Sequence, residues 1–250
     1  MDPIPGLSRV LRTSAAETGR PGPSTYQQVT EQLGSAICGG VLAPGTVLTI
    51  EDLEAATGAS RSIVRESTRV LVSMGLLRAR QRVGFQVRDE DDWNYFDPQI
   101  IRWRLLSQGH DDLVRSLVEI RIAIEPEAAR LAAERGRPDV VGRLMVCAGQ
   151  LWVTGTHGDQ TEFVEHDTEF HRLILRASGN PLFARLSDVV QEALRERALQ
   201  SLVHEPVNDR DVQLHIDLAH HVQRRESEDA WRVAREIVVR NRPVPASPHH

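Results

Sequence analysis

The most informative stretch of this 250-residue sequence is Ala59-Ser60-Arg61-Ser62-Ile63-Val64-Arg65-Glu66-Ser67-Thr68-Arg69-Val70-Leu71. It follows a short candidate helix over residues 51–57 and a turn at Gly58, and it precedes a candidate two-stranded ribbon over residues 76–80 and 84–88. A helix, a tight turn, a second helix and a hairpin in this order predict a winged helix-turn-helix, whose second helix enters the major groove of DNA.

Basic residues recur along the second helix of this predicted motif. Arg61, Arg65 and Arg69 are four residues apart, so a helix would present them as one stripe beside its apolar face. Arginines in the first turns of a groove-entering helix can donate to guanine edges or to phosphates. The alternative is a solvated arginine face, and three further arginines in the ribbon favour DNA binding over it: Arg78, Arg80 and Arg82.

The charge of the chain is divided unevenly. The net charge is −5, but residues 1–88 carry +3 and residues 89–250 carry −8. Residues 60–82 alone carry +5, and this basic patch coincides with the predicted second helix and ribbon, as nucleic-acid binding requires. The sequence has no apolar run of the ~18 residues typical of a transmembrane helix, and it begins without a signal-peptide pattern. We therefore expect a cytoplasmic protein with no membrane partner.

The order of periodic and broken segments predicts a mostly α-helical chain with two domains. Residues 108–242 show helical periodicity interrupted by glycine and proline, which predicts an antiparallel all-helical bundle of six or seven helices. We expect Trp93 and Trp103 to pack one domain on the other. The predicted parts are a disordered arm (1–23), a winged helix-turn-helix domain (24–88), a linker with a helix (89–107), the helical domain (108–242) and a disordered tail (243–250).

Two groups of residues in the helical domain are candidates for a ligand site. Arg121 and Glu125 share one helix face, either as an ordinary surface ion pair or with the arginine pointing into the bundle to hold an anion. Asp167 and His171 are also four residues apart and form a two-ligand edge for a divalent metal. His215, on a later helix, is a candidate third ligand.

Three short motifs follow one another in the first domain. They are G-x-L-x-P-G over residues 40–45, S-R-x-x-V-R-E-A-L-R-x-L-x-x-x-G-L over residues 60–76 and G-x-x-V over residues 84–87, with departures at Ser67 and Thr68. With these motifs the domain resembles the GntR family of bacterial transcription regulators. The resemblance implies a DNA-binding winged helix-turn-helix.

The second domain carries further motifs. E-x-R-x-x-x-E-x-x-A-A-x-x-A-A begins at Glu119, D-x-x-F-H begins at Asp167 and is followed by S-G-N, and a later histidine is His215. The domain resembles the FCD ligand-binding domain of the FadR subfamily. That resemblance implies an Asp and three His that hold a divalent metal, which helps to bind a small carboxylate effector. Asp167, His171 and His215 match this set, but the fourth position falls on Ile237, which cannot ligate a metal.

Together these patterns predict a homodimeric, ligand-responsive repressor that binds a pseudo-palindromic operator in double-stranded DNA. The effector is expected to be a small organic acid, and the segment over residues 93–103 resembles regulators of sugar-acid catabolism. The expected DNA contacts are Arg61, Ser62, Arg65, Arg69, Arg82 and Gly84. The expected effector contacts are Arg121, Asp167, His171 and His215, the last three also holding zinc or a similar divalent ion.

Three alternatives remain open at the level of sequence. A metal-free acid pocket would use Arg121, His171 and His215 without an ion. A helical metalloenzyme with an accessory DNA-binding domain would use the same ligands for hydrolysis or redox chemistry, but no nucleophile or general base stands beside them, so we expect no enzyme. An interaction module without a ligand would require a bundle that has no pocket.

Overall fold

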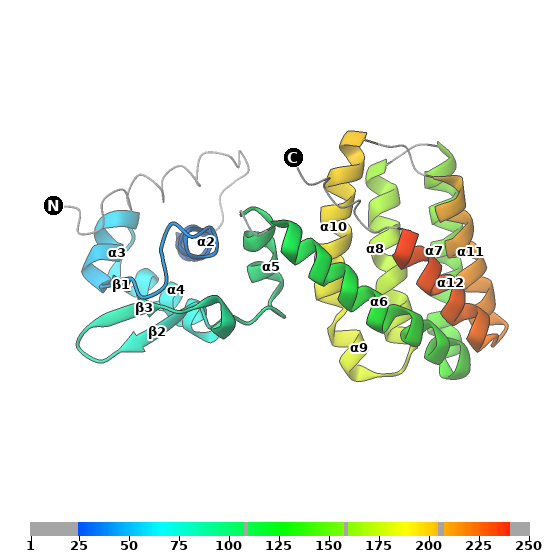
Figure 1. The fold of residues 1–250 in the computed structure, drawn as a ribbon, viewed down its shortest axis with the longest axis horizontal. Coiled ribbons are helices and arrows are strands. Elements are labelled where there is room, and N and C mark those ends of the chain that lie inside the picture. Colours follow the sequence, from blue (N-terminus) through cyan, green and yellow to red (C-terminus); the bar gives the residue numbers. More distant parts are fainter. Residues whose placement is uncertain (1–24, 108–109, 158–159, 205–207, 241–250) are drawn as a thin grey trace, which may run out of the picture. The chain divides into compact units, whose positions relative to one another are not determined.

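The computed structural model describes residues 25–107, 110–157, 160–204 and 208–240, which form two compact units that divide between His110 and Asp111. The predicted arm (1–23) and tail (243–250) lie outside the described residues. Figure 1 shows a small sheet with helices in the first unit and helices alone in the second. Among the described residues, no helix combines the length and apolar character needed to cross a membrane.

The first unit is the predicted winged helix-turn-helix. Its strands form an antiparallel sheet in the order β1-β3-β2, and the hairpin of β2 and β3 is the wing, with Leu77 opposite Val87 and Arg80 opposite Gly84. Its elements are α2 (Thr25–Cys38), β1 (Val47–Leu48), α3 (Ile50–Thr57), α4 (Arg61–Ser73), β2 (Leu77–Arg80), β3 (Gly84–Val87), a 3-10 turn (Glu90–Asp92) and α5 (Pro98–Leu105).

Both ends of α3 are fixed by local chemistry. Thr49 caps α3 by accepting from the Asp52 amide, and the Asp52 side chain accepts from the Thr49 amide in return, which satisfies two amides that the helix start leaves unpaired. Gly58 ends α3 with a φ of 69°, a left-handed conformation that glycine adopts without strain. The Thr49–Asp52 cap therefore sets where α3 begins, and Gly58 sets where it ends and the chain turns toward the recognition helix α4.

Strand β1 adds a third strand to the predicted two-stranded ribbon. Its pairing with β3 depends on Gly84, whose φ is 123°. A Cβ at this position would lie 2.4 Å from the carbonyl oxygen of Leu48, so no other residue fits against β1 without a shift of the backbone. Gly84 therefore attaches the wing to the rest of the unit.

Helix α5 is part of the core of the first unit. Trp103 is buried against α2, where a Cβ on Gly34 would lie 2.1 Å from the indole, and the indole nitrogen donates to Glu31 at 2.8 Å. Trp93 and Ile100 belong to the same core. The two tryptophans that we expected to pack one domain on the other are thus core residues of the DNA-binding unit.

The second unit is a helical bundle, as predicted. Figure 1 shows α7, α8, α10 and α11 aligned with one another, and α7 packs on α8 and α11, α8 on α10, and α11 on α12. Alanines of α6 and aliphatic residues of α8 and α11 fill one continuous core. The described part of the unit contains seven helices: α6 (His110–Arg135), α7 (Pro138–His157), α8 (Gln160–Ala177), α9 (Pro181–Arg185), α10 (Ser187–His204), α11 (Asp209–Gln223) and α12 (Ser227–Arg240).

Candidate nucleic-acid interface and metal centre

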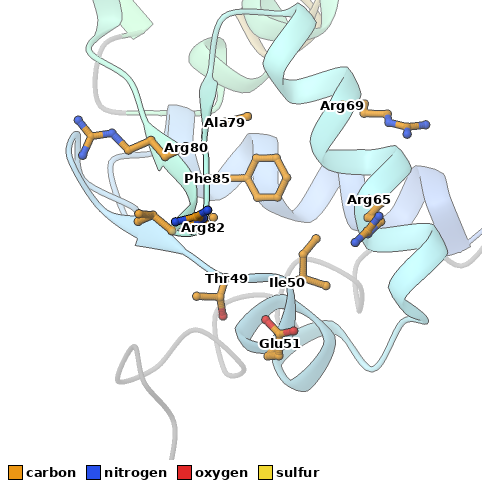
Figure 2. A pocket seen from close by; sticks show the side chains of 11 residues that line it. Thr49, Ile50, Glu51, Arg65, Arg69, Ala79, Arg80, Arg82 and Phe85 are labelled. Carbon is orange, nitrogen blue, oxygen red and sulfur yellow. The ribbon is translucent and has the colours of Figure 1, made fainter.

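A groove of about 570 Å³ lies between α4, the start of α3 and the wing, and is here called the α4–wing groove. Figure 2 shows the ring of Phe85 between the wing and α4, with Ile50 below it. Charged side chains surround these two half-buried apolar residues. The complete lining is Thr49, Ile50, Glu51, Arg65, Arg69, Ala79, Arg80, Arg82, Val83, Gly84 and Phe85.

The structure brings four of the six predicted DNA-contacting residues together in this groove. They are Arg65 and Arg69 from α4 and Arg82 and Gly84 from the wing. Arg61 and Ser62 occupy the first turn of α4, where both are exposed, but they are not among the groove-lining residues. Gly84 contributes through the backbone conformation that holds the wing.

The cations of this region differ in how far they are neutralised. Arg61 pairs with Glu51 at 2.9 Å, and Arg69 pairs with Glu66 at 3.1 Å. The side chains of Arg65, Arg80 and Arg82 form no hydrogen bond or ion pair with the described residues. A ligand that enters the groove therefore meets three exposed guanidinium groups that have no acidic partner in the described part of the chain.

Sequence reasoning missed Glu51 as a site residue. It lies in the first turn of α3 and lines the groove. The pKa of its carboxyl is lowered, mainly because the carboxylate accepts a hydrogen bond from the Glu51 backbone amide and also because it accepts one from the Arg61 guanidinium. The signal in the sequence was the start of α3: an acidic residue two positions after a capping Thr49 lies in the first turn of the helix.

A second cluster, in the core of the bundle, contains Asp167 and His171 of α8 and His215 of α11, and is here called the Asp–His–His cluster. All three side chains are buried. The Asp167 Oδ1 lies 3.0 Å from the His215 Nε2 and 3.6 Å from the His171 Nε2, and the two Nε2 atoms are 3.4 Å apart. The predicted ligands from two different helices therefore converge.

The outer nitrogens of both imidazoles face oxygen acceptors. The His215 Nδ1 lies 2.7 Å from the carbonyl oxygen of Asp211, and the His171 Nδ1 lies 2.6 Å from the Glu125 carboxylate. With the ring protons on Nδ1, each Nε2 would be free to ligate a divalent ion beside Asp167. Ligands of a tetrahedral zinc ion with bonds of about 2 Å are roughly 3.3 Å apart, so the three donors fit a divalent ion.

Arg121 supplies a buried positive charge beside the cluster. Its side chain is 2% exposed and lies with one nitrogen 2.5 Å from Glu125 and another 3.4 Å from the His171 Nε2. Burial would raise the pKa of Glu125, but Arg121 and His171 lower it to about 2. Of the two interpretations of the Arg121–Glu125 pair, the ordinary surface ion pair is wrong.

The fourth family position does not add a ligand. Ile237 is fully buried in the hydrophobic core of the bundle, and isoleucine has no donor atom. In the described ranges, no further His, Cys, Asp or Glu joins the three residues of the cluster. Any ion held here would keep coordination positions for oxygen atoms from outside the protein.

The sequence was also compared with known proteins. Residues 25–87 match the model of the bacterial regulatory proteins, gntR family, and residues 116–240 match the FCD domain. The chain is 30% identical to the galactonate operon transcriptional repressor of Escherichia coli, over 66% of this chain and 73% of that protein. It is 32% identical to an uncharacterized HTH-type transcriptional regulator of Mycobacterium tuberculosis, over 71% of this chain and 74% of that protein.

Solved structures agree on the fold. A protein described as Lar, which controls expression of the Listeria monocytogenes agr system, has a TM-score of 0.57 at 16% identity, over 89% of this chain and 96% of that one. The E. coli protein McbR/YncC has a TM-score of 0.50 at 19% identity, over 88% and 96%. The metalloenzyme alternative finds no support among these proteins. The chain belongs to the gntR family of bacterial regulatory proteins, in the branch with an FCD domain, and is a ligand-responsive DNA-binding transcription regulator.

Proposed function

We propose that this protein is a homodimeric repressor, acting in the cytoplasm, whose affinity for a pseudo-palindromic operator is set by a small organic acid. The observation that carries the proposal is the pairing of two sites in one chain. One is an open groove lined by four arginines, three of which form no ion pair with the described residues, and the other is a buried cluster of candidate metal ligands beside an arginine. The first suits a polyanion, and the second suits a small anion.

The α4–wing groove is proposed as the DNA-binding surface. Arg65 and Arg69 lie on the helix that a winged helix-turn-helix places in the major groove, while Arg82 lies on the wing. Phosphates of the strand that passes between helix and wing would meet the exposed guanidinium groups. Arg61 and Ser62, at the start of α4, are proposed to face base edges, since residues at the start of a recognition helix point into the groove.

The Asp–His–His cluster is proposed as the effector site. A divalent ion held by Asp167, His171 and His215 would supply a positive centre for the carboxylate oxygens of an acid. Arg121 adds a second positive charge, 3.4 Å from the His171 Nε2. A sugar acid matches this chemistry, because its carboxylate and neighbouring hydroxyl offer two oxygens to the open positions. The similarity to a galactonate operon repressor supports this class of effector.

Sugar acids are expected to release the protein from its operator. Operator sequences would first be selected from random duplexes, and fluorescence anisotropy would then be followed with a panel of sugar acids and with the uncharged parent sugars as controls. We expect an affinity loss of about 5- to 150-fold with the matching acid, the usual range for coupled sites. Asp167→Asn should keep operator affinity and lose the response. A variant that responds like the wild type would contradict the assignment of the effector site.

The outer face of α7 is proposed as a surface covered by a second copy of the chain. Gly142, Val146, Gly149 and Val153 form one stripe; Val146 is 64% and Val153 is 53% exposed, and a Cβ on either glycine would meet no atom within 4 Å. Small residues allow close approach of a partner helix, and two half-sites of a palindrome require two recognition helices.

Substitution in this stripe is expected to give a monomer. A glutamate at Val146 would place two like charges in a symmetric interface, and the sedimentation velocity of the purified variant would report the change in mass. Gln223→Glu, which adds the same charge at another exposed helix position, serves as the control. If Val146→Glu and the wild type sediment alike, this face is not the interface.

A further inference from the structure

Glu51 is an exposed carboxylate in a groove that is otherwise basic. Its side chain is 66% exposed. Figure 2 shows Glu51 at the end of the α4–wing groove, with Ile50 above it and Arg65 higher up on α4. The other ionisable residues of the lining are all arginines: Arg65, Arg69, Arg80 and Arg82. A surface built only for phosphates would have no use for a negative charge at this point.

The position of Glu51 is held from two sides. The capping box of Thr49 and Asp52 fixes the first turn of α3, in which Glu51 lies. Arg61, the first residue of α4, places one guanidinium nitrogen 2.9 Å from the Glu51 carboxylate and 3.7 Å from that of Glu54. A guanidinium has five N–H donors, so Arg61 can keep this contact and still donate to DNA.

The chemistry of the major groove limits what Glu51 can meet there. A carboxylate beside a phosphate is repelled, and a carboxylate that loses water without gaining a donor is costly. Guanine and thymine present no hydrogen-bond donor on this edge. Adenine presents its N6 amino group beside the N7 acceptor, which repels a carboxylate, whereas the N4 amino group of cytosine is the only polar group that cytosine presents there. An acidic side chain that accepts from this amino group is a standard base contact.

We propose that Glu51 determines operator specificity by accepting a hydrogen bond from the amino group of a cytosine while its ion pair aims Arg61 at a neighbouring guanine. The inference rests on the proposal that the α4–wing groove is the DNA-binding surface. It adds α3 to the elements that read bases. It also gives the carboxylate a second role, since its charge lowers affinity for DNA that lacks the cytosine.

The test compares the full-length protein with the Glu51→Gln variant in binding-site selection from random duplexes, followed by anisotropy on the selected operator and on unrelated DNA at fixed salt. We expect the variant to lose the preference for one C·G pair in each half-site, by roughly tenfold, the scale of one good base contact. We also expect its affinity for unrelated DNA to rise. Glutamine keeps the size of the side chain, and the Thr49–Asp52 cap is untouched.

Glu54→Gln is the matched control. Glu54 also approaches Arg61, but it does not line the groove, so this variant should keep the wild-type base preference. The inference is overturned if Glu51→Gln selects the same sequence as the wild type, or if both variants change in the same way, since the effect would then come from Arg61 alone. Arg65→Ala distinguishes failure of the proposed DNA-binding surface from failure of the role of Glu51. If Arg65→Ala binds the operator as tightly as the wild type, the groove is not the DNA-binding surface. If Arg65→Ala binds more weakly but Glu51→Gln keeps the wild-type base preference, only the role of Glu51 is rejected.

Discussion

Replacement of Arg65 by alanine is expected to lower operator affinity by about tenfold to a hundredfold, the scale of one well-placed arginine contact to a guanine. Arg65 lines the groove from the second turn of α4, and its guanidinium has no partner among the described residues. DNA would therefore bind it without first breaking an ion pair. Anisotropy titration of the operator at several salt concentrations measures the loss. If Arg65 contacts a phosphate, the variant should also show a slope of log affinity against log salt concentration that is shallower by about one.

Arg78→Ala is the control for this prediction. Arg78 lies on the same wing, but it donates to Gln86 at 3.0 Å and does not line the groove, so its loss should change operator affinity little. Binding of the effector should be the same in both variants, because its proposed site is in the other unit. Equal operator affinity for Arg65→Ala and the wild type would rule out the groove as the DNA-binding surface.

Replacement of His215 by alanine is expected to abolish stoichiometric metal binding. It removes one of the three ligands that the described residues supply, and we expect affinity to fall more than about a hundredfold, since loss of a residue that merely supports a ligand already costs up to about that factor. The metal content of protein that has been stripped, reloaded with zinc and dialysed would be measured. Thermal unfolding should show that zinc stabilises the wild type by about 2.7 kcal/mol at a hundredfold excess over Kd, and does not stabilise the variant.

His220→Ala tests whether this effect is specific. His220 lies on the same helix, α11, but it is not part of the Asp–His–His cluster, so the variant should bind zinc like the wild type. A wild-type protein that retains no metal and gains no stability would contradict the metal centre. The effector site would then be the metal-free pocket of Arg121, His171 and His215.

The elements that the sequence predicted well are those encoded by local signals. The spacing of Arg61, Arg65 and Arg69 predicted the recognition helix, which the structure places at Arg61–Ser73, and the fold class and the family are confirmed. Asp167 and His171 were paired by helical periodicity alone. His215 joins this pair because α11, which carries it, packs beside α8 in the bundle.

The features that the sequence did not predict depend on contacts between distant segments. Strand β1 is two residues long and exists because it pairs with β3, about forty residues later. The place of Glu51 in the groove depends on how α3 meets α4. The direction of Arg121 was undecided because a helix places it beside Glu125 whether that face is buried or not, and only the packing of α6 on α8 decides this.

The contact between Gly34 and Trp103 bears on where the DNA-binding fragment ends. The family model stops at Val87, yet α5 inserts its indole at a point on α2 where even a methyl group has no room, and it hydrogen-bonds to Glu31. A fragment cut at the end of the wing would lose the groups that cover α2, and would expose apolar surface that the intact unit buries. The autonomous folding unit therefore reaches at least to Leu105, some twenty residues beyond the recognisable motif.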